Sequence, residues 1–589
     1  MSRYGYTRVS NRVSGGTGWD HDYHSTHGRG GGRCTSFTTM SKVTSRKTFD
    51  RRASKMGVHI YQQPTRESDL GQSSATASEK DEAAVQVENG DIDPPRNNEN
   101  VVHKEEFYAG NSIYAKLHRI TGRWGVEERG IERLPSDERD ARKPMTVGIT
   151  WFSINMTFVS LTLGVLPVAA YGLGFVDAAI LIIAFNFLGS LPVALFSSLG
   201  PVFGLRQIPL SRFYFGYHGA KLAALINLAV CVASSAINAV VGAQLFHAIQ
   251  PKMPGWAGIL IVSLTTLVIC TMGHRFVHTY ERYSWLPCFV VLLIVLGVFA
   301  RSGNFDPLLP LGTGTAEASG VLSFAASVYT FTAGWAAYAA DYSIYQPADP
   351  KPSAAIFWWT FAGNFFPTVF TELLGAAVMT ATVHRPDFQE AYDEAGLGGV
   401  FSHVLIPHVG KGFGTFCIVL LALSIIGTNI ATVYSVSMSV QTLGRKTQRV
   451  PRFLWTLIST VGYTAFAIPA YAEFSTYLEN LLLAMSYWIS IYLGISLTEH
   501  YMFRRGVRGY KPEDYTDAKR LPPGYAAIAS FCVGAVGVAM GIAQEWYRGP
   551  VIKAVGEEFM GDLGCVFGFL FTTVSYMVLR TMEKRYLER

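Results

Sequence analysis

The sequence predicts an all-α membrane protein with twelve transmembrane helices. Of its 589 residues, 49% are hydrophobic and only 16% are charged, a balance that does not fit several soluble domains. The apolar residues gather in runs of roughly 20, the length that a helix needs to cross about 30 Å of hydrocarbon. Lys and Arg are concentrated in alternate connections between these runs, as in proteins that cross a membrane many times.

The first 140 residues differ from the rest and are predicted to form a disordered cytoplasmic tail. Residues 1–54 are rich in Gly, Ser, Thr, Tyr and Arg, and residues 62–106 are acidic and polar. Neither stretch can bury enough apolar surface to offset the entropy lost on ordering. No early apolar core resembles a signal peptide, so the first membrane helix is expected to act as the insertion signal. The membrane domain then covers residues 141–581, and residues 582–589 form a short cytoplasmic tail.

The apolar runs and the basic residues between them define the membrane topology. With the N terminus inside, cytoplasmic segments after the first span carry 20 Lys and Arg residues and external ones carry 6, which favours both termini in the cytoplasm. The predicted spans are 148–172, 177–198, 222–246, 256–273, 284–300, 320–343, 354–380, 412–440, 453–471, 476–497, 524–544 and 562–580.

The first and sixth spans contain polar residues and glycine where the membrane midplane should be. Span one carries Ser153, Asn155 and Thr157, and span six carries Thr332 and Gly334. Polar, Gly-interrupted spans at corresponding positions of two halves predict broken helices that form a binding site. The offset of five spans predicts two inverted five-helix repeats followed by two extra helices. Alternatively, the hydroxyls bond to the preceding turn and the glycines only aid packing.

Several function classes find no support in the sequence. The seven cysteines include no CxxC pair, and no His/Cys cluster has metal-ligand spacing, so we expect neither a disulfide framework nor a metal site. No GxxxxGK[ST] loop indicates an ATP-driven motor. No nucleophile elbow or catalytic dyad is present, so the chain is not predicted to be an enzyme. If the protein transports a solute, an ion gradient must drive it.

Motifs along most of the chain resemble the nucleobase–cation symporter-1 family, and its fungal purine–cytosine permease-like branch most of all. The resemblance extends from about Glu128 to the C terminus. The matching segments are GPVFGLRQIPLSRFYFG (200–216), GHRFVHTYERYSWLPC (273–288), TAGWAAYAADYSIYQP (332–347), TFAGNFFPTVFTELLGAAV (360–378), EHYMFRR (499–505) and FGFLFTTVSYMVLRTMEKR (567–585).

This resemblance implies a fold of the leucine-transporter type, with helices one to five and six to ten as inverted repeats. It implies a plasma-membrane importer of a purine- or cytosine-type nucleobase that works by proton symport and alternating access. Its partners would be a small-molecule substrate and the lipid bilayer, with no nucleic acid. No cofactor is expected, and sodium is the less favoured coupling ion. Lysines in the loop after span ten leave trafficking or ubiquitylation machinery open as a further partner.

The resemblance also assigns residues to a substrate site between helices one, three, six and eight. Asn238 matches an amide residue of helix three, and its two donors and one acceptor suit the edge of a nitrogenous ring. Trp335 matches a helix-six tryptophan that stacks on the face of the substrate. Ser160 falls at a polar position of helix one. The alternatives are a helix–helix hydrogen bond for Asn238, a packed indole for Trp335 and a structural hydroxyl for Ser160.

Helices three and eight depart from the pattern of the branch. Ser234 stands where a second tryptophan is usual, and Thr428, Asn429 and Thr432 stand where helix eight usually reads NN-x-PN. The loss of an aromatic wall and an amide predicts a site with less stacking and more hydroxyl character. Vitamin B6, a flat pyridine rich in hydroxyls, is therefore the competing substrate. A nutrient receptor that binds without transporting is the alternative from a different class.

Three acidic residues are candidates for coupling or gating: Glu281, Asp341 and Glu372. Glu281 lies at the cytoplasmic end of span five and alternatively pairs with a neighbouring arginine. Asp341 ends span six, near the expected inner gate. Glu372 lies among apolar residues of span seven, where a carboxyl group can hold or pass a proton. A packing or capping role is the alternative for Glu372.

Overall fold

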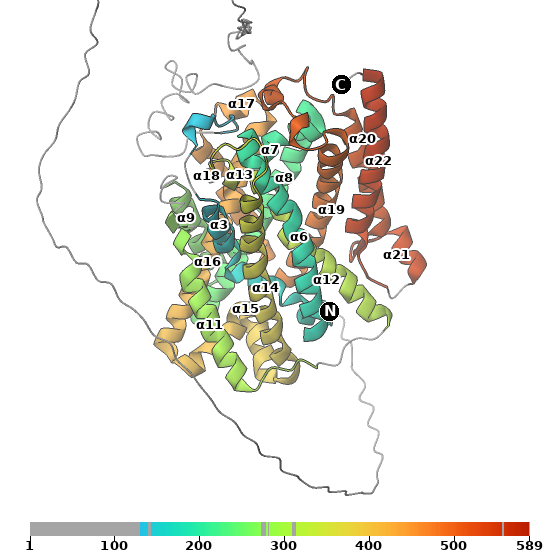
Figure 1. The fold of residues 1–589 in the computed structure, drawn as a ribbon. Helices are drawn as coiled ribbons and strands as arrows, with labels where there is room; N and C mark the ends of the chain where they lie inside the picture. The colour runs from blue at the N-terminus through green and yellow to red at the C-terminus, as the bar shows by residue number, and fades with distance from the viewer. Residues whose placement is uncertain are drawn as a thin grey trace, which may run out of the picture. The chain divides into compact units, whose positions relative to one another are not determined.

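Helices form nearly all of the described part of the chain (Figure 1). The computed structural model describes residues 130–139, 143–271, 279–280, 282–308, 314–556 and 559–587, all within the unit Ile92–Arg589. Residues 1–129 of the predicted tail lie outside the described residues, so their disorder stays a prediction. Residues 130–139 belong with the folded part, because Ile131 and Leu134 are each only 2% exposed.

The elements follow one another in a nearly continuous series. They are η1 (Ser136–Glu138), α3 (Met145–Asn155), α4 (Phe158–Leu163), α5 (Leu166–Ala169), α6 (Phe175–Phe203), α7 (Gln207–Leu210), α8 (Arg212–Ile249), α9 (Gly255–Thr271), α11 (Trp285–Ser302), α12 (Thr315–Ala333), η2 (Gly334–Tyr338), α13 (Ala339–Ser343), α14 (Ala354–His384), α15 (Pro386–Val409), α16 (Lys411–Leu443), α17 (Arg445–Gln448), α18 (Arg452–Ala470), α19 (Phe474–Thr498), η3 (Glu499–Phe503), η4 (Val507–Gly509), η5 (Pro512–Thr516), α20 (Tyr525–Gly541), β1 (Ala543–Gln544), β2 (Tyr547–Arg548), α21 (Pro550–Val555) and α22 (Gly564–Leu587). The strands β1 and β2 pair as a short antiparallel hairpin.

The predicted membrane class is confirmed. In the described part of the chain, eight helices are long and apolar enough to cross a membrane, and the bent pair formed by α3 and α4–α5 makes a ninth. The helices α9 and α20 are shorter but apolar, and α12, η2 and α13 together cover the predicted sixth span. Every predicted span therefore coincides with helix, whereas the count of twelve crossings and the inverted repeat stay predictions.

Both helices predicted to be broken depart from regular α-helix. The first span is interrupted at Met156 and Thr157, where the backbone becomes extended (φ −135°, ψ 163° at Thr157), and its two halves are bent by 53°. In the sixth span, α12 ends at Ala333 and continues as the 3₁₀ turn η2. Tyr338 then leaves helical geometry (φ −144°, ψ 20°) before α13 begins. An interrupted helix exposes backbone groups that other residues or a ligand must satisfy.

The connection between the seventh and eighth spans was not predicted to be helical, and here the structure corrects the sequence analysis. It forms α15, whose two halves meet at a kink at Ala395 and Gly396. Gly396 has φ +57°, a conformation that favours glycine. Helix α15 packs on α8 and α16, and a Cβ atom at Gly398 would lie 2.3 Å from the Gln244 carbonyl oxygen. Acidic residues interrupt this segment, so its apolar contacts were not apparent as a span.

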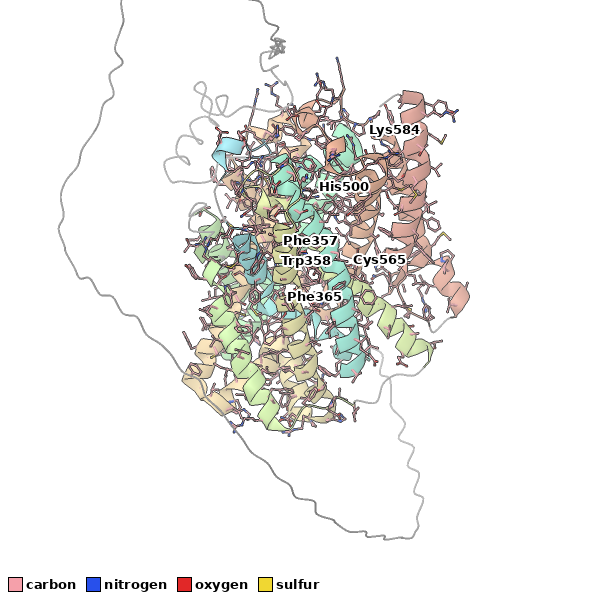
Figure 2. All side chains as sticks on the ribbon, viewed as in Figure 1. Phe357, Trp358, Phe365, His500, Cys565 and Lys584 are labelled. Carbon is pink, nitrogen blue, oxygen red and sulfur yellow. The ribbon has the colours of Figure 1, made fainter. Side chains whose placement is uncertain are left out.

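Helix α14 shows how the bundle separates lipid-facing from buried side chains. Figure 2 shows Phe357, Trp358 and Phe365 along this helix, and Trp358 is 59% exposed, as expected of a side chain that faces lipid. The opposite face is polar and fully buried, and it consists of Thr360, Asn364, Thr368, Thr371 and Glu372. Buried polar groups at membrane depth mark contacts between helices or functional sites.

A buried cluster of charges joins α19, η3 and α22 at one end of the bundle, which His500 and Lys584 mark in Figure 2. The Arg580 guanidinium lies 3.2 Å from the Glu499 carboxylate and 2.7 Å from that of Glu583. Arg504 also binds the Glu499 carboxylate, at 2.9 Å. The side chains of Arg580, Glu499 and Glu583 are nearly inaccessible to solvent. The cluster therefore fixes α22 against the rest of the bundle.

We expect Arg580→Leu to destabilise the protein by about 3 kcal/mol or more, because removing one partner of a buried ion pair leaves carboxylates uncompensated. The thermal unfolding midpoint of the purified protein measures this loss. Arg585→Leu, an exposed position on the same helix, should leave the midpoint unchanged. Equal midpoints for the two variants would contradict a structural role for the Arg580 cluster.

Candidate binding site at the broken helices

A cavity of about 60 Å³ lies inside the bundle where the two interrupted helices meet α8, α16 and α19. Helix α4 and the turn η2, which follow or form the interruptions, both contribute to its wall. The residues that line it are Val159, Thr162, Leu163, Ser234, Ile237, Asn238, Phe331, Gly334, Trp335, Tyr338, Thr428, Thr432, Leu478, Leu481, Leu482 and Met485. The structure therefore brings together five of the seven residues predicted to bind substrate.

Asn238 contributes a polar group without a protein partner to this cavity. Its side chain is 3% exposed, and its Nδ2 amide forms no hydrogen bond within the described part of the chain. A buried donor left unpaired is unfavourable by about 1–3 kcal/mol. The amide is thus free to donate to a ligand in the cavity.

Trp335 forms an aromatic part of the same wall. Its indole is 5% exposed and packs edge-to-face against Trp151, with ring centroids 5.7 Å apart, and against Tyr338, at 5.3 Å. Edge-to-face contacts fix the orientation of an aromatic ring. Two aromatic neighbours therefore hold the buried indole in the cavity wall.

Thr428 and Ser424 on α16 bind the backbone at the interruption of the first span. Thr428 Oγ1 donates to the carbonyl oxygen of Ile154 at 2.7 Å, and Ser424 Oγ accepts from the Phe158 amide at 3.1 Å. Thr428 also lies 3.1 Å from the hydroxyl of Thr157. These contacts satisfy backbone groups that the broken helix exposes and fasten it to α16.

The remaining predicted binding residues divide between the cavity and the helix contacts around it. Ser234 lines the cavity and donates to the sulfur of Met485 at 3.6 Å, whereas the Thr432 hydroxyl lies 2.7 Å from that of Ser235. Asn429 and Ser160 do not line it. The Asn429 amide points elsewhere and donates to Thr266 Oγ1 at 3.2 Å and to the Tyr463 hydroxyl at 3.3 Å. Ser160 is buried in α4, at 1% exposure.

The family described as "Permease for cytosine/purines, uracil, thiamine, allantoin" matches residues 133–562. The chain belongs to this family of membrane permeases, the nucleobase–cation symporter-1 family, as the sequence motifs predicted. The family consists of permeases rather than enzymes.

Two curated relatives and one solved structure are informative about the permease. The purine-cytosine permease fcyB of Emericella nidulans is 44% identical over 82% of the chain and 94% of the relative. The vitamin B6 transporter TPN1 of Saccharomyces cerevisiae is 28% identical over 81% of the chain and 92% of the relative. The nucleobase-cation-symport-1 transporter Mhp1, solved in a closed conformation with bromovinylhydantoin bound, superposes with a TM-score of 0.60 at 12% identity. The superposition covers 78% of the permease and 96% of Mhp1. This likeness supports the predicted leucine-transporter-type fold.

The three predicted coupling residues of the permease have different surroundings. Asp341 is 4% exposed, and its Oδ1 accepts a hydrogen bond of 2.7 Å from the Gln207 amide at the start of α7. Glu372 is fully buried in α14 and accepts from Asn186 Nδ2 at 2.6 Å. Neither lines the cavity. Glu281 lies outside the described residues.

Helix α19 contributes a wall of the permease cavity that was not predicted. Leu478, Leu481, Leu482 and Met485 recur at intervals of three and four residues, the spacing of one helix face. This spacing is visible in the sequence and indicates an apolar helix face. It does not distinguish a cavity wall from a face packed on another helix, because both are apolar.

Proposed function

We propose that the permease imports a small nitrogenous-ring compound, of the purine or cytosine type, by proton symport with alternating access. The observation that carries this proposal is the unpartnered amide of Asn238, which shares one buried cavity with the indole of Trp335. A flat ring can bind its edge to the amide and its face to the indole. The import would take place at the plasma membrane, with both termini in the cytoplasm.

The composition of the cavity wall supports a substrate that is small, flat and mostly uncharged. No Lys, Arg, Asp or Glu is among the lining residues, and most of the wall is aliphatic or aromatic. An ionic substrate in such surroundings would lack a counter-charge, which is unfavourable in a low-dielectric interior. Neutral nucleobases meet this requirement, and purine-cytosine permease is the name of the relative fcyB.

Vitamin B6 is the second candidate, because hydroxyl side chains line the cavity. Ser234 and Thr432 both line it, and each can exchange hydrogen bonds with a ring hydroxyl. The 28% identity to a vitamin B6 transporter favours keeping this candidate. Both substrates would use the same amide and indole.

Alternating access in this permease would rely on the interrupted helices. The extended residues at Met156 and Thr157 separate two helical halves, and a break between two helices is a place where the backbone can bend. The cavity residues Thr162 and Leu163 follow this interruption, and Trp335 lies in η2. Closure around a substrate would therefore move the segments that contact it.

Uptake competition in a host that lacks its own nucleobase and vitamin B6 transporters tests the proposal. Labelled cytosine, adenine and pyridoxine are supplied to cells that produce the full chain, with and without a protonophore. We expect saturable, protonophore-sensitive accumulation of cytosine or adenine. Preferred accumulation of pyridoxine would replace the nucleobase by vitamin B6. Saturable binding without accumulation would identify a receptor and overturn the transport proposal.

A further inference from the structure

Glu372 is an acidic residue in the interior of the membrane-spanning bundle. It lies in the middle part of α14, a helix of 31 residues, and is 0% exposed. Its carboxyl group does not line the cavity. Ionisable residues within membrane spans are unfavourable and mark ion or proton pathways in many transporters.

The contacts of this carboxyl group suit a neutral acid better than a carboxylate. Oε2 accepts a hydrogen bond of 2.6 Å from Asn186 Nδ2, and Oε1 has no hydrogen-bond partner among the described residues. None of the cations in the described ion pairs contacts it. A full negative charge with one neutral donor would be strongly destabilised in this interior, whereas the protonated acid has a much smaller desolvation penalty.

Asn186 connects Glu372 to the sixth span. Its Nδ2 also donates to the Ile182 carbonyl at 2.9 Å, and its Oδ1 accepts a hydrogen bond from the Thr332 hydroxyl. The amide therefore uses both donors, and the chain Glu372–Asn186–Thr332 joins α14, α6 and α12. Thr332 lies one helical turn before Trp335, which lines the cavity. Two hydrogen bonds therefore connect the carboxyl group to Thr332, one turn before the indole.

The backbone of Glu372 also contacts the first span. A Cβ atom at Gly164 would lie 1.9 Å from the Glu372 carbonyl oxygen, so the two backbones touch. Leu163, the residue before Gly164, lines the cavity. Ile182 and Thr332, which hydrogen-bond to Asn186, and Gly164, which meets the Glu372 backbone, carry no ionisable group. The first span thus meets the backbone of Glu372 directly, and the sixth span is linked to its carboxyl group through Asn186.

We propose that Glu372 binds the co-transported proton and that Asn186 and Thr332 link its protonation to the substrate cavity. The carboxylate takes up one proton while its surroundings are hydrated from outside. Closure of the interrupted helices around the substrate then buries the neutral acid, and opening towards the cytoplasm hydrates the acid and releases the proton. One proton crosses with each substrate molecule. This mechanism rests on the proposed symport and names the group that performs it.

Glu372→Gln tests this role, because glutamine has the shape of the protonated acid but cannot release a proton. With whichever of labelled cytosine, adenine or pyridoxine the wild-type protein accumulates, we expect accumulation to fall by at least about tenfold. Exchange of internal for external substrate should stay within about threefold of wild type, because exchange needs no net proton movement. Uptake should also lose its sensitivity to the protonophore. Accumulation by Glu372→Gln with wild-type protonophore sensitivity would overturn the proposal.

Two further variants keep the outcome interpretable. Glu390→Gln, an exposed position on α15, should accumulate substrate like wild type. If Glu372→Gln does not reach the membrane, Glu372→Asp replaces it: accumulation is then expected to persist with a shifted pH dependence, and an unchanged pH profile would overturn the proposal. A wild-type protein that accumulates none of the three compounds would instead contradict the proposed function, so the two failures are distinguishable.

Discussion

Asn238→Ala is expected to lower the uptake of the preferred nucleobase by about 10- to 100-fold at substrate concentrations below KM. The amide lies in the cavity with a donor that no protein group satisfies. A ligand group that loses this partner is left buried and unpaired, which is unfavourable by about 1–3 kcal/mol and corresponds to about 5- to 150-fold in affinity. Initial uptake rates over a range of concentrations, in cells that display equal amounts of protein, measure the effect.

Asn227→Ala is the matched control, because Asn227 lies on the same helix and is also buried. Its amide donates to Ser435 Oγ at 3.0 Å and to Ser439 Oγ at 2.9 Å, so its role is to join α8 to α16. We expect this variant to lower the amount of folded protein without raising KM. If both variants change abundance alike and leave KM unaltered, Asn238 is a packing residue and the binding assignment is wrong.

Gly164→Ala is expected to prevent normal folding or to lower the stability of the permease by more than most single substitutions. The added methyl group would lie 1.9 Å from a backbone oxygen of α14, and a backbone atom cannot move aside as a side chain can. Overpacking of a close contact is unfavourable by about 1–3 kcal/mol and occasionally by more. Membrane abundance and the thermal midpoint of the purified protein measure the loss.

Gly297→Ala provides the comparison for this prediction. Gly297 lies in α11, and a Cβ atom there meets nothing within 4 Å. Alanine favours helix over glycine by about 1 kcal/mol, so this variant should be as stable as wild type or more stable. A wild-type midpoint for Gly164→Ala would show that α4 and α14 can move apart without loss of stability. It would contradict the prediction that this close backbone contact stabilises the fold.

Residue chemistry made parts of the fold and site predictable. The polar residues around Thr157 and Gly334 predicted the interrupted helices, because hydroxyl groups and glycine at the membrane midplane are typical of discontinuous helices. Asn238 and Trp335 were predicted together, and they line one cavity. In both cases the prediction rested on polar residues or glycine at positions in a membrane span where packing alone favours apolar side chains.

Other features depend on three-dimensional contacts between distant residues, and these contacts cannot be predicted from a single sequence. Asn429 has the same chemistry as Asn238, yet its amide turns towards Thr266 and Tyr463, because the rotation of α16 decides which helix face meets the cavity. The partner of Glu372 was also unpredictable, since Asn186 lies 186 positions away. Helix α15 was missed because its charges resemble those of an external loop.

If the cavity binds the substrate as proposed, its α19 wall would determine how strictly the permease selects substrates by size. Leu478, Leu481, Leu482 and Met485 are unbranched or γ-branched side chains that can change rotamer, and methionine in particular adapts to irregular shapes. Recognition would then be strict at the polar edge and permissive along this side. Ring analogues that carry a halogen or methyl group on the α19 side should still enter, so toxic antimetabolites modified there could use the permease as a route into the cell.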